Sequence, residues 1–287
     1  MSAIYRKEMR IYLSGMFGWS VMAVLLFFLG LFTSVFNLLS GISGVSYTLT
    51  SMHWILIVLI PLLTMRSIAE ERHARTDQLL YSLPIRQSEV VVAKYLAACT
   101  VFLLPTAVYA LCPVILAGFG EVSLAAAYTA LFGYILLGAA LIAISLFVSS
   151  LVENQILAAV LSIVSMLVIY FMSSIATLLP TGALASFLLC VLAALAIGAL
   201  VWNSTKNLSG GMAVSAVLIL PISVVYIVNT DLFEGLVPNA LFSLDLFTRF
   251  SGFSYGRFDL PATVFYLSLI GFFLFLTVRS MEKRRLV

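Results

Sequence analysis

Residues 65–94 read MRSIAEERHARTDQLLYSLPIRQSEVVVAK and form a polar block between two long apolar stretches. This polar block holds nine of the chain's 27 charged residues: Arg66, Glu70, Glu71, Arg72, Arg75, Asp77, Arg86, Glu89 and Lys94. Charged side chains at this density are costly in the hydrocarbon core of a bilayer. The polar block therefore predicts an aqueous loop between two membrane-spanning helices.

The middle of the polar block has the pattern of a short amphipathic helix. Thr76 and Asp77 favour a helix start, because the hydroxyl accepts a free backbone N–H and the carboxylate meets the positive end of the helix dipole. Three leucines would then share one face: Leu79, Leu80 and Leu83. Pro84 ends the helix, and Ser88 with Glu89 caps the next one. A helix this short is not stable alone, so its apolar stripe predicts a packing partner.

The composition predicts an all-α polytopic membrane protein with a single domain over residues 1–287. Of the residues, 63% are hydrophobic and 9% are charged, whereas soluble domains carry about 25% charged residues. A helix needs about 20 apolar residues to cross a bilayer, which predicts about eight spans. The expected spans are residues 17–39, 52–66, 91–117, 123–148, 155–178, 183–203, 212–229 and 261–278.

The basic residues predict the orientation, because lysine and arginine are retained on the cytoplasmic side of a membrane. With eight spans, only Arg249 and Arg257 fall on the outer side. The others share the opposite side: Arg6, Lys7, Arg10, Arg66, Arg72, Arg75, Arg86, Lys94, Lys206, Arg279, Lys283, Arg284 and Arg285. Both termini and the polar block are therefore expected in the cytoplasm. No cleavable signal peptide is evident, because the first apolar stretch is long enough to span the membrane. The net charge of +3 reflects this bias and does not indicate nucleic-acid binding.

Three further segments show amphipathic or loop patterns. Residues 4–16 predict an interfacial helix, with Tyr5, Met9, Tyr12 and Met16 on one face and Arg6 and Arg10 on another. This helix is either a simple anchor or also a contact for a cytosolic partner. Residues 149–155, with Glu153 and Asn154, form either a plain hairpin turn or a second docking surface. Residues 230–260 predict an amphipathic helix on the outer membrane face.

The residue types argue against most catalytic chemistry. Cys99, Cys112 and Cys190 lie far apart within apolar spans, which indicates packing rather than a metal site. No ionisable residue lies clearly in the middle of a span, so ion coupling is not expected. The chain has no phosphate loop of the form GxxxxGK[ST]. Residues 252–256 match GxSxG, and Ser254 with His53 leaves an intramembrane hydrolase open as a minor alternative.

Four stretches resemble the permease subunits of type-2 ATP-binding-cassette exporters, and are similar to the gliding-motility-associated subgroup. They are YRKEMRIYLSGMFGW from Tyr5, RSIAEERHARTDQLLYSLPIRQSEVVVAKYLA from Arg66, LFVSSLVENQILAAV from Leu146 and DLPATVFYLSLIGFFLFLTVRSMEKRR from Asp259. The chain departs from this family in two places. Ala74-Arg75 stands where family members often have glycine before the threonine, and residues 183–229 add a pair of spans to the six-span core.

The resemblance implies which segments of this chain contact an ATPase subunit and which partners complete the transporter. Residues 1–16 would be an elbow helix with Arg6, Lys7 and Arg10, and residues 66–90 would form a cytoplasmic coupling loop with its helix at Thr76 to Leu83. The implied contacts to the ATPase are Glu70, Glu71, Thr76, Asp77, Leu79, Leu80, Leu83, Pro84, Glu153 and Asn154. This chain would bind no cofactor, and ATP and Mg would bind the partner. The implied partners are two ATPase subunits, a second permease protomer in a homodimer or heterodimer, membrane lipid and, as an option, an extracytoplasmic auxiliary protein.

The function implied by the resemblance is ATP-driven export across the cytoplasmic membrane of a prokaryote. The alternative is a non-transporting mechanotransmitter or membrane anchor of an envelope complex, which needs no continuous path between protomers. Spans rich in phenylalanine and leucine are compatible with lipids, lipid-linked molecules or hydrophobic peptides as substrates, and equally with simple exposure to lipid.

Overall fold

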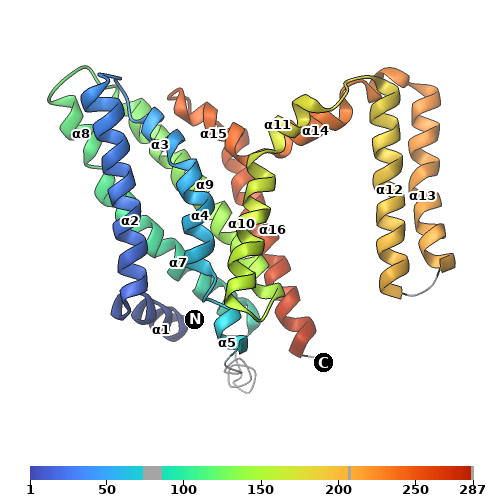
Figure 1. Ribbon diagram of the computed structural model, residues 1–287, viewed down its shortest axis with the longest axis horizontal. Helices are drawn as coiled ribbons and strands as arrows, with labels where there is room; N and C mark the ends of the chain where they lie inside the picture. Colours follow the sequence, from blue (N-terminus) through green and yellow to red (C-terminus); the bar gives the residue numbers. More distant parts are fainter. Residues whose placement is uncertain (74–85, 206–207, 286–287) are drawn as a thin grey trace. The chain divides into compact units, whose positions relative to one another are not determined.

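The computed structural model describes residues 1–73, 86–205 and 208–285, and all regular secondary structure in these ranges is helical. The chain divides into two compact units, one of Met1–Ile169 with Arg249–Val287 and one of Tyr170–Thr248 (Figure 1). Within the described ranges, seven helices are long and apolar enough to cross a membrane, and an eighth span results if the broken pair at residues 155–178 is counted as one. The expectation of an all-α multi-pass protein is confirmed.

The first unit contains the N-terminal and C-terminal helices and most of the predicted spans. Its helices are α1 (Ser2–Ser14), α2 (Met16–Thr33) with a π-helical turn (Ser34–Leu39), α3 (Ser46–Ser51), α4 (His53–Thr64), α5 (Ala69–His73), α7 (Gln87–Tyr109), α8 (Cys112–Ala117), α9 (Leu124–Leu151), α10 (Gln155–Tyr170) and α16 (Leu260–Arg285). The predicted spans in this unit fall on these helices, with boundaries that differ by a few residues.

Helix α9 forms the core of the first unit, where it contacts α4, α7 and α16. It starts after Ser123, whose hydroxyl accepts a hydrogen bond from the backbone N–H of Ala126. Two glycines allow close packing: the ring of Phe253 lies against Gly133 and the ring of Phe102 against Gly138. Small residues of this kind let membrane helices approach closely, since lipid offers no hydrophobic drive for association.

Three predicted spans are interrupted in the structure. In the second, α4 ends at Thr64 and a turn over residues 65–68 precedes α5. The third is divided into α7 and α8 at residues 110–111, next to Pro113 in the first turn of α8. The fifth is divided at Phe171 into α10 and α11 (Met172–Leu178). Apolar composition specifies a span but not where its helix breaks.

The second unit is built around a hairpin of two long helices (Figure 1). These are α12 (Ala183–Thr205) and α13 (Leu208–Val228), which pack on each other where Gly198 meets Gly211. Residues 183–229 therefore form two adjacent spans, as the sequence predicted. The unit also holds α11, a 3-10 turn (Thr230–Phe233) and α14 (Leu236–Leu244).

The amphipathic segment predicted in residues 230–260 is divided into short helical elements. Gly235 has a φ of 67°, a left-handed conformation that glycine adopts at little cost, and it precedes α14. Asp245 then separates α14 from α15 (Leu246–Ser254), because its carboxylate accepts the backbone N–H groups of Phe247 (2.9 Å) and Thr248 (3.2 Å). A carboxylate that caps a helix start in this way ends the preceding helix and begins another.

We expect Gly18→Ala to destabilise the protein, because the backbones of α1 and α2 meet at this residue. A Cβ atom at Gly18 would lie 2.3 Å from the backbone oxygen of Tyr12. The expected loss is about 1–3 kcal/mol, typical of an overpacked site. The measurement is thermal unfolding of the detergent-solubilised protein.

Gly30→Ala is the matched control, because Gly30 lies in the same helix α2 and a Cβ there would meet nothing within 4 Å. Alanine is the better helix former, so this variant should unfold at the wild-type temperature or slightly above it. Equal unfolding temperatures for the two variants would contradict the close contact between α1 and α2.

Candidate functional site

Lys94 is the centre of a group of buried charges at one end of the first unit. Its ammonium group forms ion pairs with Glu8 (2.8 Å) and Glu71 (2.9 Å), and it donates a hydrogen bond to the backbone carbonyl of Ser67 (2.6 Å). The lysine side chain is 1% exposed and that of Glu8 is 5% exposed. A buried ammonium is strongly disfavoured unless it is paired and hydrogen-bonded, and here three oxygens satisfy it.

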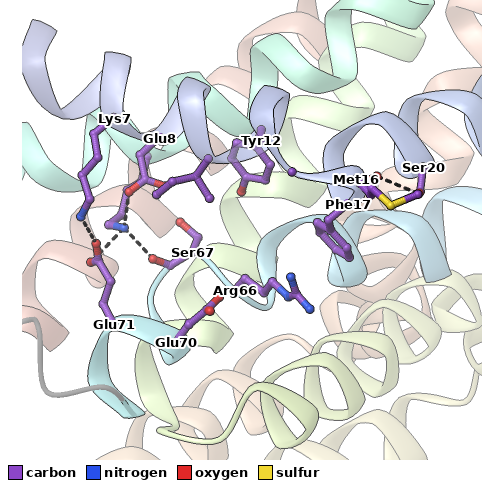
Figure 2. Close-up of a pocket in the computed structure, with 13 residues that line it drawn as sticks. Lys7, Glu8, Tyr12, Met16, Phe17, Ser20, Arg66, Ser67, Glu70 and Glu71 are labelled. Atoms are coloured by element: carbon purple, nitrogen blue, oxygen red, sulfur yellow. Dashed lines mark hydrogen bonds and ion pairs between the residues drawn. The ribbon is translucent and has the colours of Figure 1, made fainter.

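Lys7 completes this group with a 2.9 Å ion pair to Glu71. We call Lys7, Glu8, Glu71 and Lys94 the charge cluster (Figure 2). Its two lysines balance its two carboxylates. The cluster joins α1, α5 and α7, which are far apart in the sequence, and therefore fixes both described ends of the polar block to the N-terminal helix.

The charge cluster also shifts the pKa values of side chains on α1. Burial by itself lowers the pKa of Lys7, but the hydrogen bond to Glu71 and the charges of Glu71 and Glu8 outweigh it, so the pKa lies above its ordinary value. Burial, helped by the charges of Glu8 and Glu70, raises the pKa of the Tyr12 phenol. Tyr12 is therefore neutral and donates to the carbonyl of Leu63 at 3.1 Å, which holds α1 against the end of α4.

A cleft of about 790 Å³ lies beside the charge cluster. Its apolar lining includes Met16 and Phe17 from the start of α2, and its polar lining includes Arg66 and Glu70. Figure 2 shows Arg66 reaching toward Phe17, and the guanidinium carbon lies 4.7 Å from the centre of the phenylalanine ring. The cleft thus has charged and apolar walls side by side.

A second set of contacts joins the polar block to the loop at residues 149–155. The backbone N–H of Ala69 donates to the Ser149 hydroxyl at 3.3 Å, and the Arg72 guanidinium donates to the Ser150 carbonyl. Ser280 of α16 donates to the same carbonyl at 3.3 Å. Both serines lie in the last turn of α9 and are fully buried. The helix α5 is therefore tied to the ends of α9 and α16 as well as to α1.

The structure brings together only part of the predicted site. Glu71 and Lys7 lie in the charge cluster, Glu70 lines the cleft, and Arg6 and Arg10 are exposed on α1. Glu153 and Asn154 lie in the exposed break between α9 and α10. The remaining predicted coupling residues lie outside the described residues: Thr76, Asp77, Leu79, Leu80, Leu83 and Pro84.

Asn154 has a local structural role. Its side-chain oxygen accepts a hydrogen bond from the backbone N–H of Ile156 at 2.8 Å, which caps the start of α10. Glu153 next to it is exposed. Both interpretations of residues 149–155, a hairpin turn and a docking surface, are compatible with this geometry.

Sequence reasoning missed the importance of two residues in the charge cluster. The sequence indicates Lys94 only as one of the charges of the polar block, and it gives no role to Glu8. The signal for Lys94 is its position inside the apolar run VVVAKYLAA over residues 90–98. A lysine in such a run predicts a buried partner. No sequence pattern identifies Glu8 as that partner, because residues 8 and 94 meet only in the folded protein.

The GxSxG match does not form a nucleophile elbow. A nucleophile elbow requires a strand followed by a sharp turn into a helix. Ser254 is the last residue of α15, and no strand occurs among the described residues. The carbonyl of Ser254 accepts a hydrogen bond from Ser46 at 2.8 Å, and the His53 ring packs edge-on against Phe250 at 5.0 Å. Both residues thus contribute to packing between α15 and the start of the second span.

Comparison with known proteins identifies the family. The model of a family described as ABC-2 family transporter protein matches residues 33–185, which is more than half of the chain. The chain belongs to the ABC-2 family of transporter proteins. No curated protein and no solved structure matches it.

Membership of the ABC-2 family makes the chain a multi-pass permease component of a transporter. The match extends from the end of α2 to the start of α12 and includes the polar block and the loop at residues 149–155. Most of the α12–α13 hairpin lies beyond the matched residues.

We expect Lys94→Met to destabilise the protein strongly, because it leaves the buried carboxylate of Glu8 without its cation. Removing one partner of a buried ion pair costs about 3–5 kcal/mol. Lys7→Met is the control: the Lys7 side chain is 52% exposed, and an exposed ion pair contributes about 1 kcal/mol or less. Thermal unfolding in detergent measures both.

The double variant Glu8→Gln with Lys94→Met should recover part of this loss, since it removes both charges of the most buried pair. Non-additivity of this kind is expected for residues in direct contact. Additive losses in the double variant would contradict a direct interaction between Glu8 and Lys94.

Proposed function

We propose that this ABC-2 permease moves a substrate out of the cell and that a separate ATPase subunit drives it. The observation that carries the proposal is the anchoring of the polar block on both sides. In the first part of the block, Ala69 and Arg72 form hydrogen bonds to the end of α9. In the same part, Glu71 forms ion pairs with Lys7 and Lys94. At the other end of the block, Lys94 forms an ion pair with Glu8. A segment held at both ends by the transmembrane helices can transmit a displacement to them.

The proposed orientation places this end of the first unit in the cytoplasm, with both termini. Basic residues gather at this end, as retention of lysine and arginine on the cytoplasmic side requires. The helix α1 is then an elbow helix in the membrane interface. Its exposed face carries Arg6 and Arg10, and its buried face holds Ile4, Glu8 and Tyr12 against the bundle.

The proposed coupling element is the helix at Thr76 to Leu83, whose leucine stripe would bind a groove of the ATPase. Closure of two ATPase subunits on ATP and Mg would push this element. The push would reach α1 through the charge cluster, and α9 and α16 through the contacts of Ser149 and Ser150. Glu153 and Asn154, in the loop that these serines begin, would form a second contact with the ATPase.

The working unit would contain two permease protomers, because the family mechanism requires two ATPase subunits that close on each other. Its location would be the cytoplasmic membrane of a prokaryote. Within the family, the chain would belong to the gliding-motility-associated subgroup, which the four sequence stretches resemble. The alternative, a mechanotransmitter without a transport path, would share the same coupling element. The two differ only in whether a substrate crosses the membrane.

We expect Leu79→Asp to release the ATPase, because it places a charge in an apolar interface. The experiment purifies the tagged full-length chain from its native host in mild detergent and identifies phosphate-loop ATPases by mass spectrometry. Wild-type protein should retain such an ATPase, and the variant should lose most of it, at least about tenfold for one desolvated charge.

Gln78→Asp is the matched control, because it adds the same charge one residue away, on the side of the predicted helix opposite the leucine stripe. It should retain the ATPase at the wild-type level. Full retention by Leu79→Asp, or equal loss from both variants, would contradict the coupling helix. Retention of the ATPase and ATP-dependent movement of a partner without substrate transfer would favour the mechanotransmitter.

A further inference from the structure

The lining of the cleft includes two charged residues that do not belong to the charge cluster. Six charged residues line it, and four of them neutralise one another as the charge cluster. The other two are Arg66 and Glu70, which are both exposed. Among the residues that the structure describes, neither takes part in an ion pair. The cleft thus offers one cation and one anion to a ligand.

The polar lining also includes a hydroxyl group that has no hydrogen-bond partner among the described residues. Ser67 follows Arg66 in the chain and is 4% exposed, and its hydroxyl has no hydrogen-bond partner among the described residues. Buried hydroxyl groups are normally hydrogen-bonded, so an orphan hydroxyl in the lining of a cleft indicates a missing partner.

The apolar walls indicate where such a ligand comes from. Met16 is 88% exposed and Ile11 is 54% exposed, and both line the cleft beside Phe17. Helix α2 starts at Met16 as a membrane span, so these side chains lie at the end of a span, at the depth of lipid headgroups. An amphiphile from the membrane would cover them, whereas a free ion would leave them in water.

We propose that this cleft binds a phospholipid whose headgroup carries both a phosphate and a primary ammonium, as in phosphatidylethanolamine. Arg66 binds the phosphate, because a guanidinium matches phosphate oxygens with two parallel hydrogen bonds. Glu70 accepts hydrogen bonds from the ammonium. The acyl chains lie along Met16, Phe17 and Ile11. The volume of about 790 Å³ is in the range of ordinary ligand sites.

The two charges also determine which lipids are rejected. A lipid with a phosphate and no ammonium, such as phosphatidylglycerol, satisfies Arg66 but is repelled by Glu70. Phosphatidylcholine carries a quaternary ammonium that has no N–H group, so it gives Glu70 no hydrogen bond. The binding does not depend on whether the bound lipid is transported, and it does not involve the predicted coupling helix.

The test reconstitutes the purified full-length protein, with its native partners, in nanodiscs that contain equal amounts of the three lipids. Native mass spectrometry of the released protein then counts the lipids retained. Wild-type protein should retain phosphatidylethanolamine over each of the other two. Arg66→Gln should lower retention of phosphatidylethanolamine and phosphatidylglycerol about tenfold, since it removes a charge-assisted contact. Glu70→Gln should reverse the preference in favour of phosphatidylglycerol.

Two control variants remove the same charges elsewhere. Arg10→Gln and Glu121→Gln alter exposed residues that do not line the cleft, and they should keep the wild-type pattern. All variants should show the wild-type unfolding temperature, because none of these residues is buried. Equal retention of the three lipids by wild-type protein, or unchanged phosphatidylethanolamine retention in Arg66→Gln, would overturn the proposal. Loss of the ATPase in Leu79→Asp would leave this result unaffected.

Discussion

The packing of α1, α5 and α7 at one end of the first unit depends on the buried ammonium of Lys94. An ammonium removed from water must meet negative or polar groups, and no neighbour in its own helix α7 supplies them. The partners are instead Glu8 of α1, Glu71 of α5 and the carbonyl of Ser67 in the turn before α5. Three segments separated by up to 86 residues are thereby held in one arrangement.

The break after α4 follows from this constraint. A helix that continued through residues 65–68 would have its carbonyl groups bonded within the helix, and Ser67 could not offer its carbonyl to Lys94 in the same way. The turn frees that carbonyl and leaves Arg66 and Glu70 in the wall of the cleft. The same contacts that bury one lysine therefore create an accessible, charged cleft next to the membrane spans.

This end of the unit is also held by hydrogen bonds between side chains and backbone groups at the end of α9. Ser149 and Ser150 are small enough to be buried where α5, α9 and α16 converge, and their oxygen atoms accept bonds from Ala69, Arg72 and Ser280. Because α9 is largely buried and contacts α4, α7 and α16, these bonds connect the polar block to the core of the unit. Under the proposed function, this is the route from the ATPase to the helices.

The sequence by itself determined the approximate number and limits of the spans, because about 20 consecutive apolar residues have no stable place other than a bilayer. It also predicted the polar block and the amphipathic α1, since charge density and periodicity are local properties. The tertiary structure alone decided the helix breaks at residues 65–68 and Phe171, the pairing of Lys94 with Glu8 and the cleft at Arg66 and Glu70. These features depend on contacts between segments distant in the chain, which local sequence patterns do not encode.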